Sequence, residues 1–375
     1  MRVLAVDIGT GTQDVLYFDS QLHVENSYKI VAPSPTMVCR RRIQQATQAG
    51  RPLALYGTIM GGGPVSWAIM DHLNLGLEVY STPSAAATID DDLDRVAELG
   101  IKITSPKHIA RADNAVLVEL GDFNLDVFSN AFAQFGLELQ PDVLAIAVFD
   151  HGNSPPGYSD RQFRFDYLTR NLQSNPQLYV LAHQADQVPA DMTRMQAVAQ
   201  AALATGIPTM IMDTAPAAIC GALLDPVVSQ REHLVAVNVG NLHTLAFQLG
   251  PKGIEGLFEH HTGELTCSQL DGFLRLLIDR DLTHEMVFDS QGHGSLLLER
   301  DEPIQRDPMV TVTGPRRSLM DSSVFEPHMA APFGDMMLAG CYGMLSVLPH
   351  VFPQHASEIP KTLSQSGAKA PWELG

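Results

Sequence analysis

Cysteine and long apolar runs are both scarce in this chain of 375 residues. The four cysteines stand far apart and form neither a CxxC pair nor a zinc-ribbon spacing, so a reducing compartment fits their use. The longest candidate apolar run, Val143 to Phe149, is far shorter than the roughly 18 residues that a membrane span needs. The chain opens directly into an apolar segment, Val3 to Val6, and a cleavable signal is not expected. We therefore expect a cytoplasmic protein with no membrane partner.

Basic residues are also in short supply. The chain has 24 Lys and Arg against 42 Asp and Glu, which gives a formal net charge of −18. This charge repels phosphate backbones and anionic lipids, so nucleic acid is not expected as a partner. The content of 45% hydrophobic and 18% charged residues excludes a disordered or fibrous protein. At about 150 residues per domain, the length predicts two or three domains.

Short apolar segments alternate with amphipathic segments of helical length along the chain, which is typical of α/β proteins. The expected strands are Arg2–Ile8, Asp14–Asp19, Leu53–Tyr56, Ala115–Glu119, Val143–Phe149, Leu178–Ala182, Thr209–Met212, Leu234–Val239, Thr244–Leu249 and Met309–Thr313. The expected helices are Val65–Leu73, Asp90–Glu98, Asn124–Phe135, Asp191–Leu203, Ala217–Leu224, Ser268–Asp279 and Asp335–Leu348. Pro349–Gly375 is rich in proline, serine and lysine, and an irregular surface tail is expected there.

A weak internal repeat is the most informative feature. Val3–Phe18 reads VLAVDIGTGTQDVLYF, and Leu234–Phe247 reads LVAVNVGNLHTLAF. Each copy predicts a strand, a tight glycine turn and a returning strand. Such a hairpin presents backbone N–H groups and small hydroxyls to a phosphate, because glycine allows a sharp turn and close approach. Two facing hairpins would clamp a polyphosphate from both sides, whereas a single copy would equally fit a plain turn.

Three further segments, together with the two hairpins, form an ordered set of five motifs along the chain. Met212–Asp225 is a helix of small residues directly before the second hairpin, and small residues permit close helix packing. Val310–Arg317 is a strand that ends at Gly314, where the backbone can approach a flat ligand. Asp335–Leu345 supplies a second helix with small residues at helical spacing.

In this order, the five segments resemble the two phosphate loops, two connecting helices and adenosine strand of the superfamily that contains actin, sugar kinases and heat-shock chaperone ATPases. The resemblance covers the whole chain. The hairpin spacing is most similar to that of the ATP-dependent hydantoinase and oxoprolinase branch and of the reactivating ATPases near it. Each motif is degenerate, so the resemblance depends on the order of the motifs along the chain.

The resemblance implies two actin-like (ribonuclease H-like) α/β domains, with ATP and Mg²⁺ in the cleft between them. It assigns Asp7 to the metal, held through water, since a hard cation prefers carboxylate oxygen and its own waters; the alternative is that Asp7 merely caps the glycine turn. The other candidates for nucleotide binding are Gly9, Thr10, Gly11, Thr12, Asn238, Gly240, Asn241, His243, Thr244 and Gly314. His243 would equally fit a surface turn.

Two positions depart from the pattern of the superfamily. Asn238 stands where many relatives carry an acid in the second hairpin, and Thr214 stands where chaperone-like relatives have glutamate. Neither side chain can accept a proton from water, so rapid ATP hydrolysis is not expected. Nucleotide binding and phosphoryl transfer remain compatible with Asn238 and Thr214, because both processes depend mostly on positioning and charge neutralisation.

The chain is also similar to an uncharacterised group of this superfamily that is sometimes labelled pyruvate formate-lyase activating enzymes. Known radical activators of that kind hold an iron–sulfur cluster on three closely spaced cysteines. No three cysteines of this chain are closely spaced. The sequence therefore gives no support for radical chemistry.

A second group of polar residues follows the strand that ends at Phe149. It begins Asp150-His151-Gly-Asn, at the carboxyl end of the strand, where α/β sheets bind ligands. Asp150 or His151 is the candidate general base for an acceptor hydroxyl or amide, and Arg161 or Arg164 would receive an anion. A capped turn with a proline-stiffened loop explains these residues equally well.

Three consecutive glycines, Gly61, Gly62 and Gly63, join a strand to the helix near Val65. They can expose N–H groups at a helix N-terminus, which attracts anions. The Gly-Lys-Ser/Thr ending of a Walker loop is absent. We expect ligand contact there, with a flexible connection as the alternative.

Histidines are concentrated in the C-terminal part, at His260, His261 and His293. Neutral imidazoles with Glu259 or Glu264 could hold Zn²⁺, Mn²⁺ or Fe²⁺, but the spacing matches no metal motif. Adjacent histidines on an extended segment point to opposite sides. Substrate contact by His260 and His261, or a simple surface location, is the favoured interpretation.

The expected domains are 1–225, 226–330 and a C-terminal helix and tail, 331–375, that returns to the first domain. The leading hypothesis is an ATP-binding protein that couples nucleotide binding or phosphoryl transfer to turnover of a small-molecule acceptor. The alternative is a weakly hydrolysing, ATP-dependent regulator or reactivator of a partner enzyme. Asn238 and Thr214 favour the second hypothesis; the Asp150 loop and the three glycines favour the first.

Overall fold

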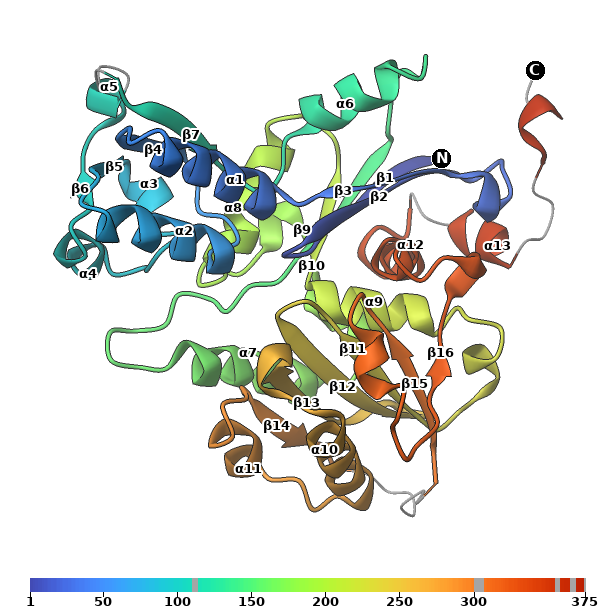
Figure 1. Cartoon of the computed structure of the whole chain (residues 1–375). Coiled ribbons are helices and arrows are strands. Elements are labelled where there is room, and N and C mark those ends of the chain that lie inside the picture. Colours follow the sequence, from blue (N-terminus) through green and yellow to red (C-terminus); the bar gives the residue numbers. More distant parts are fainter. Residues whose placement is uncertain (110–113, 300–306, 355–357, 365–368, 374–375) are drawn as a thin grey trace.

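The computed structural model describes residues 1–375 except 110–113, 300–306, 355–357, 365–368 and 374–375. The described chain contains two six-stranded sheets and one four-stranded sheet, with helices packed around them (Figure 1). Within the described ranges, no helix combines the length and the apolar character needed to cross a bilayer.

The first six-stranded sheet has the order β3-β2-β1-β8-β10-β9. Its strands are β1 (Arg2–Ile8), β2 (Thr12–Asp19), β3 (Tyr28–Pro33), β8 (Val143–Val148), β9 (Ala182–Gln184) and β10 (Thr209–Met212). Strands β1, β2 and β3 form an antiparallel meander, and β8 and β10 continue the sheet parallel to β1. All six residues of β8 are buried, which explains its unbroken apolar sequence.

The second six-stranded sheet repeats this plan, with the order β14-β13-β12-β11-β15-β16. Its strands are β11 (Leu234–Val239), β12 (His243–Gly250), β13 (Gly253–His261), β14 (Gly294–Leu297), β15 (Met309–Thr313) and β16 (His328–Met329). Strands β11, β12 and β13 again form an antiparallel meander, β15 and β16 continue the sheet parallel to β11, and β14 pairs antiparallel with β13 at the other edge.

Five strands have the same order and directions in the two sheets, β3-β2-β1-β8-β10 and β13-β12-β11-β15-β16, and this arrangement is ribonuclease H-like. The protein is therefore an α/β protein with two actin-like domains, which confirms the expected fold class. The domain limits 1–225, 226–330 and 331–375 stay a prediction.

The four-stranded sheet belongs to a segment inserted between β3 and β8. It has the order β6-β5-β4-β7 and is fully parallel. Its strands are β4 (Leu53–Gly57), β5 (Val79–Ser81), β6 (Lys102–Ile103) and β7 (Val116–Leu120), and its helices are α1 (Pro35–Gln48), α2 (Gly63–Asn74), α3 (Pro83–Ala86), α4 (Leu93–Glu98) and α5 (Pro106–Ile109). This segment buries a hydrophobic core of its own.

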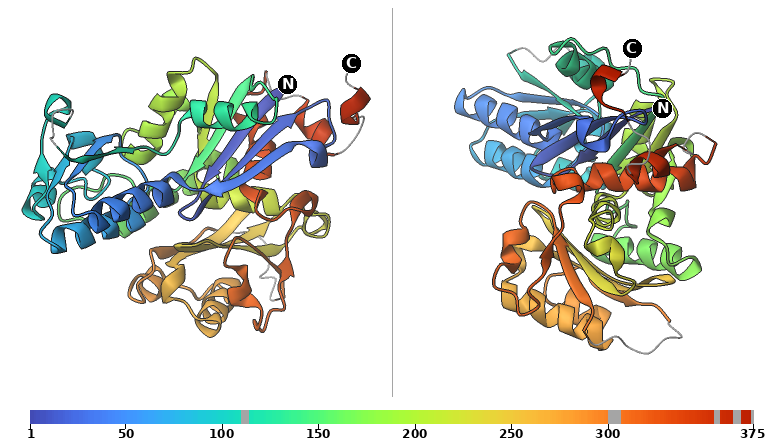
Figure 2. Two further views of the ribbon diagram at one scale, coloured as in Figure 1. Left: turned by 45° about the horizontal axis from the view of Figure 1, so that its top comes forward. Right: turned by 90° about the vertical axis from the view of Figure 1, so that its right-hand side faces the viewer.

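Two small-residue helices, α9 (Thr214–Ala222) and α12 (Ala339–Val351), cross between the two six-stranded sheets (Figure 2). A Cβ atom on Gly221 would lie 1.8 Å from the Ala339 carbonyl oxygen, and one on Gly343 would lie 1.8 Å from the Ala217 carbonyl oxygen. Only glycine permits this backbone approach. The expected close packing of these two segments is confirmed.

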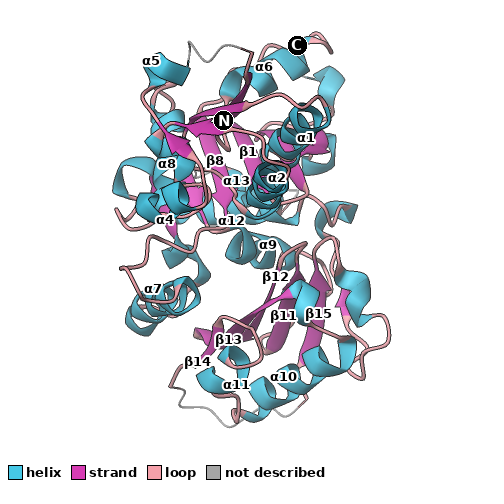
Figure 3. Ribbon diagram, turned by 60° about the vertical axis from the view of Figure 1, so that its left-hand side comes forward, coloured by secondary structure: helices cyan, strands magenta, loops and turns pink. Residues whose placement is uncertain are grey.

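The helix α7 (Asp160–Ser174) lies on the second domain, although it follows β8 of the first sheet in sequence (Figure 3). It packs against β14. The remaining helices are α6 (Leu125–Ala133), α8 (Thr193–Leu203), α10 (Cys267–Asp279), α11 (His284–Phe288) and α13 (Ile359–Leu363).

Several sequence expectations need correction. The segment expected as a strand at Leu178–Ala182 is a 3-10 helix over Leu178–Leu181, followed by β9. The segment expected as an irregular tail begins inside α12 and contains α13, whose Ile359 is fully buried; residues 355–357, 365–368 and 374–375 lie outside the described residues. The helices α1 and α7 are missing from the sequence expectations because both are rich in Arg, Gln and Asp or Thr and carry little apolar signal.

Candidate functional site

The turns of the two repeated hairpins face one pocket between the domains. In each turn the first glycine donates the same backbone bond: Gly9 N–H to the Thr12 carbonyl and Gly240 N–H to the His243 carbonyl, both at 2.9 Å. The two tips meet, since a Cβ atom on Gly11 would lie 2.7 Å from Asn241 Nδ2. The nucleotide candidates that line this pocket are Asp7, Gly9, Thr10, Thr12, Asn238, Gly240, Asn241, His243 and Gly314. The hairpins therefore have the facing arrangement that a phosphate clamp requires.

Thr244 does not belong to the lining of this pocket. Its side chain is completely buried, and its hydroxyl lies 2.9 Å from the hydroxyl of Thr262. It therefore secures the β12–β13 pairing instead of offering a donor to a phosphate.

Asp7 and Asp14 form a pair of buried carboxylates at the base of the pocket. They are direct cross-strand partners on β1 and β2. Within the part of the chain that the structure describes, neither Asp7 Oδ1 nor Asp14 Oδ1 has a hydrogen-bond partner. Burial, with the neighbouring Asp14 charge, raises the pKa of Asp7 well above its usual range, and burial raises the pKa of Asp14 to about 7. Two such carboxyls must hold protons or share a cation.

The helix α12 closes the pocket directly over this pair. A Cβ atom on Gly340 would lie 1.9 Å from Asp7 Oδ2, so only glycine fits there. On the opposite wall, Gly314 has φ of +101°, and a Cβ atom there would lie 2.6 Å from Asn238 Oδ1. The backbone at Gly314, directly after β15, thus comes close to the second hairpin. This closeness is expected if Gly314 forms a wall of the pocket that contacts a flat ligand.

The raised pKa of Asp14 predicts that the metal-free protein loses stability as the pH rises from about 4 to about 7. In this range the folded protein keeps a proton that the unfolded chain has already lost, so unfolding releases protons and becomes easier. Over this pH range, the raised pKa of Asp14 should lower the free energy of unfolding by on the order of 4 kcal/mol. Urea unfolding in EDTA, compared between the wild type and Asp14→Asn, measures it. A difference between the two proteins that does not change over this pH range would contradict the prediction.

A second, larger pocket joins the first. The two share five lining residues: Thr10, Phe149, Arg194, Leu242 and His243. Gly61, Gly62, Gly63, Asp150, His151 and Arg161 line the second pocket, so the structure brings the three glycines and the Asp150 loop together. The Arg194 guanidinium makes a two-pronged pair with Asp122, at 2.8 and 3.1 Å, and Asp122 also accepts from Gly61 N–H.

Asp150 is held by backbone donors, which argues against its expected role as a base. Its Oδ1 accepts from Gly152 N–H and its Oδ2 from Met195 N–H, both at 2.8 Å. Burial raises the pKa of Asp150, although these bonds oppose the shift. Because both oxygens are occupied, Asp150 fixes the turn and the start of α8, which is the structural alternative that the sequence left open.

Arg164 is not available for a ligand anion. It is completely buried, donates to both oxygens of Glu259 and to Asp213 Oδ2, and its guanidinium carbon lies 3.8 Å from the centre of the Phe149 ring. Asp213 follows β10 of the first sheet, whereas Glu259 lies on β13 of the second. Arg164 therefore joins the two domains through a buried ion network.

Arg161 also has a structural role. It donates to the carbonyl oxygens of Phe288 and Gly292, and its guanidinium lies over the Phe288 ring. These contacts fasten the start of α7 to the loop that carries His293.

The histidines of the second domain divide as their alternation on β13 predicts. His260 faces the interior and lies 2.9 Å from the Ser290 carbonyl, away from both pockets. The His261 ring lies on the other side, 4.6 Å from the His293 ring and 5.1 Å from the His243 ring. His260 is thus placed away from the expected substrate, and His261 borders a group of imidazoles that also includes His151.

Sequence reasoning did not identify Asp14, Phe149 and Arg194 as pocket residues. Asp14 could have been found, because a hairpin that turns at residues 9–11 pairs residue 7 with residue 14. Arg194 could not, since its place depends on how α8 packs against the inserted segment.

The fold and the pocket define a two-domain actin-like protein with two phosphate-type hairpins across one cleft. A family model described as "Putative pyruvate format-lyase activating enzyme (DUF1786)" matches residues 60–319. The chain belongs to this family, as the sequence resemblance indicated. No curated protein matches the chain.

Solved structures with a similar chain course include two bacterial proteins. The ethanolamine utilization protein EutJ from Carboxydothermus hydrogenoformans is 12% identical over 92% of this chain and 89% of its own, with a TM-score of 0.32. The ROK hexokinase from Thermus thermophilus is 12% identical over 92% of this chain and 98% of its own, with a TM-score of 0.30. At these TM-scores, the fold assignment depends on the strand order described above.

The cysteines do not support the activity in the description of the family. Cys39, Cys220 and Cys341 are buried, and burial raises the pKa of Cys39 to about 11 and that of Cys220 to about 12, so both thiols stay protonated. In the described ranges no cysteine belongs to a group of three or more potential metal ligands. An iron–sulfur cluster does not fit these residues.

Proposed function

We propose that this protein binds ATP with Mg²⁺ in the cleft between its two actin-like domains. The observation that carries the proposal is the facing pair of hairpins above two buried carboxylates, Asp7 and Asp14, whose Oδ1 atoms have no partner among the described residues. Carboxylate oxygens suit a hard dication, and a cation there would relieve the cost of burying two acids. The hairpin glycines leave room for phosphate oxygens near backbone N–H groups.

We further propose that the bound nucleotide donates a phosphoryl group to a small molecule in the second pocket. The two pockets meet at Thr10, Leu242 and His243, so a terminal phosphate in the first would face an acceptor in the second. Phosphoryl transfer requires mainly positioning and charge neutralisation, which this junction can supply. The N-terminal end of α2 at Gly63 also borders the second pocket, but Asp90, Asp91, Asp92 and Asp160 line it as well, so the lining does not select an anionic acceptor.

One observation favours the regulatory alternative. Asp150 has both carboxylate oxygens occupied by backbone donors, and Asn238 stands in the second hairpin where a base would be needed. With neither Asp150 nor Asn238 available as a base, ATP hydrolysis would be slow, and nucleotide binding could instead change the contact with a partner enzyme.

Calorimetric titration with Mg-ATP and with a non-hydrolysable analogue tests the binding step. We expect one saturable site per chain and a melting midpoint that rises with nucleotide concentration, since a ligand that binds only the folded state stabilises it. A thermal-shift screen of metabolites in the presence of the analogue then tests the acceptor. No binding of any nucleotide would refute the proposal, whereas nucleotide binding without an acceptor would favour the regulatory alternative.

A further inference from the structure

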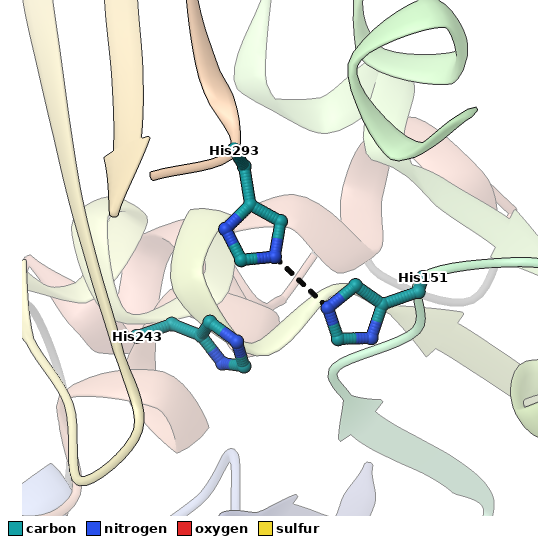
Figure 4. Close-up of side chains that lie close together, drawn as sticks. All are labelled: His151, His243 and His293. Carbon is teal, nitrogen blue, oxygen red and sulfur yellow. Dashed lines mark hydrogen bonds between the residues drawn. The ribbon is translucent and has the colours of Figure 1, made fainter. Parts of the chain in front are cut away.

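We propose that His151, His243 and His293 form a binding site for one first-row transition-metal dication, such as Zn²⁺, between the two domains. The three imidazoles come from segments far apart in the sequence and converge beside the junction of the two pockets (Figure 4). His151 follows β8, His243 begins β12, and His293 directly precedes β14. The site uses nitrogen ligands, so it is chemically distinct from the oxygen-based Mg²⁺ site at Asp7.

The distances between the imidazole nitrogens suit a metal ion. One ring nitrogen from each histidine lies within 4.8 Å of the others, and His151 Nε2 lies 2.9 Å from His293 Nε2. Zn–N bonds of about 2.0–2.1 Å in a tetrahedral site separate the nitrogens by about 3.4 Å. The His151 and His293 nitrogens therefore need to move apart by about half an ångström to admit the ion, whereas nitrogens that lie up to 4.8 Å apart need to move closer together.

The protonation state of the rings also suits a metal. Burial lowers the pKa of His151 to about 3, and burial also lowers the pKa of His243 and His293 well below the usual range of histidine, helped by neighbouring histidines and Arg164. The rings are therefore neutral at physiological pH, and a neutral imidazole has a free nitrogen lone pair for a metal. Without a metal, one of the two Nε2 atoms must carry a proton and donate it to the other; a dication would instead take the lone pair of both Nε2 atoms, with the ring proton on Nδ1.

The surrounding contacts hold the rings in place. His243 stacks on Phe149, with ring centres 4.1 Å apart and planes 5° apart. The His293 backbone N–H donates to the Glu259 carbonyl at 2.9 Å, and Arg161 fastens the preceding loop. Such fixed rings reduce the entropy cost of assembling a metal site.

The charges around the site permit a dication. Arg164 and Arg194 are the arginines whose charge acts on His151 and His243, and they are paired with Asp213 and Glu259 and with Asp122, respectively. Glu259 Oε1 also lies 3.6 Å from His293 Nε2, which places a carboxylate next to the ion. Because His151 and His243 line the second pocket, a fourth position on the metal would face that pocket and accept a water or an anionic substrate oxygen.

Titration of the EDTA-treated full-length protein with Co²⁺ tests the site without nucleotide. We expect one equivalent of Co²⁺ to give the visible absorption of a four-coordinate, nitrogen-ligated ion, and Zn²⁺ to displace it. His293→Gln and His151→Gln should each weaken binding at least about 100-fold. The control His350→Gln removes an imidazole that stacks on Tyr179 in a different pocket, and it should bind Co²⁺ as the wild type does.

The outcomes separate this proposal from the proposed function. His151→Gln keeps the test valid if His293→Gln fails to fold, because His151 is only half-buried. Co²⁺ binding that survives both substitutions, or that is lost in Asp7→Asn instead, would overturn the three-histidine site. Tight Co²⁺ binding in a protein that binds no nucleotide would support the metal site and refute only the ATP proposal.

Discussion

Asp7→Asn is expected to weaken Mg²⁺-dependent nucleotide binding by about 100-fold or more while leaving the fold intact. Asp7 Oδ1 has no partner among the residues described, so the fold does not depend on a hydrogen bond donated to this atom. Asparagine also removes the repulsion between Asp7 and Asp14. In the absence of metal, the melting temperature at neutral pH should therefore equal or exceed that of the wild type. Calorimetry with Mg-ATP and thermal melting in EDTA measure the two effects.

Asp71→Asn provides the matched control for this substitution. Asp71 is exposed on α2, away from both pockets, and its replacement makes the same change of charge. This variant should bind Mg-ATP normally. If Asp7→Asn bound Mg-ATP as tightly as Asp71→Asn, Asp7 would not hold the metal; if it melted well below the wild type, the carboxylate would have a structural role as a turn cap.

Much of the nucleotide cleft could be predicted from the sequence because local patterns determine it. The strands Arg2–Ile8 and Leu234–Val239 have the expected bounds, since an apolar run that ends in a polar residue and glycine encodes a buried strand and its turn. The small residues of α9 and α12 indicated a close helix crossing, which the glycine contacts confirm. These features depend on neighbours in the sequence or on residue size alone.

The interdomain contacts could not be predicted in the same way. The position of α7 on the second domain brings Arg161 and Arg164 to partners that are about a hundred residues away in sequence. For this reason the anion-binding role expected for Arg164 is not supported, whereas that of Arg161, which lines the second pocket, stays a prediction. The histidine group likewise joins residues 151, 243 and 293, so no spacing motif could reveal it. Long-range packing decides these contacts, and composition or periodicity does not encode it.

Arg164→Met is expected to destabilise the protein by about 3–5 kcal/mol, because it leaves two buried carboxylates without their cation. The Arg164, Asp213 and Glu259 side chains are at most 1% exposed, and the two ion pairs are 2.7 Å long. Methionine keeps much of the side-chain volume, so the loss of stability measures the effect of the missing charge more than that of a cavity. The control Arg95→Met breaks an exposed pair with Asp90 and should cost under about 1 kcal/mol.

The double variant Arg164→Met/Glu259→Gln distinguishes a missing charge from disturbed packing. If uncompensated charge causes the loss, neutralising Glu259 should restore part of the stability, so that the double variant unfolds at a higher urea concentration than Arg164→Met alone. If the two losses simply add, packing of the arginine against Phe149, at 3.8 Å, would be the main contribution. Because Asp213 directly follows β10 of the first sheet and Glu259 lies on β13 of the second, the charge mechanism also predicts that Arg164→Met loosens the contact between the domains. Hydrogen exchange should then increase at the strand ends around Asp213 and Glu259 before it increases in the core of either sheet.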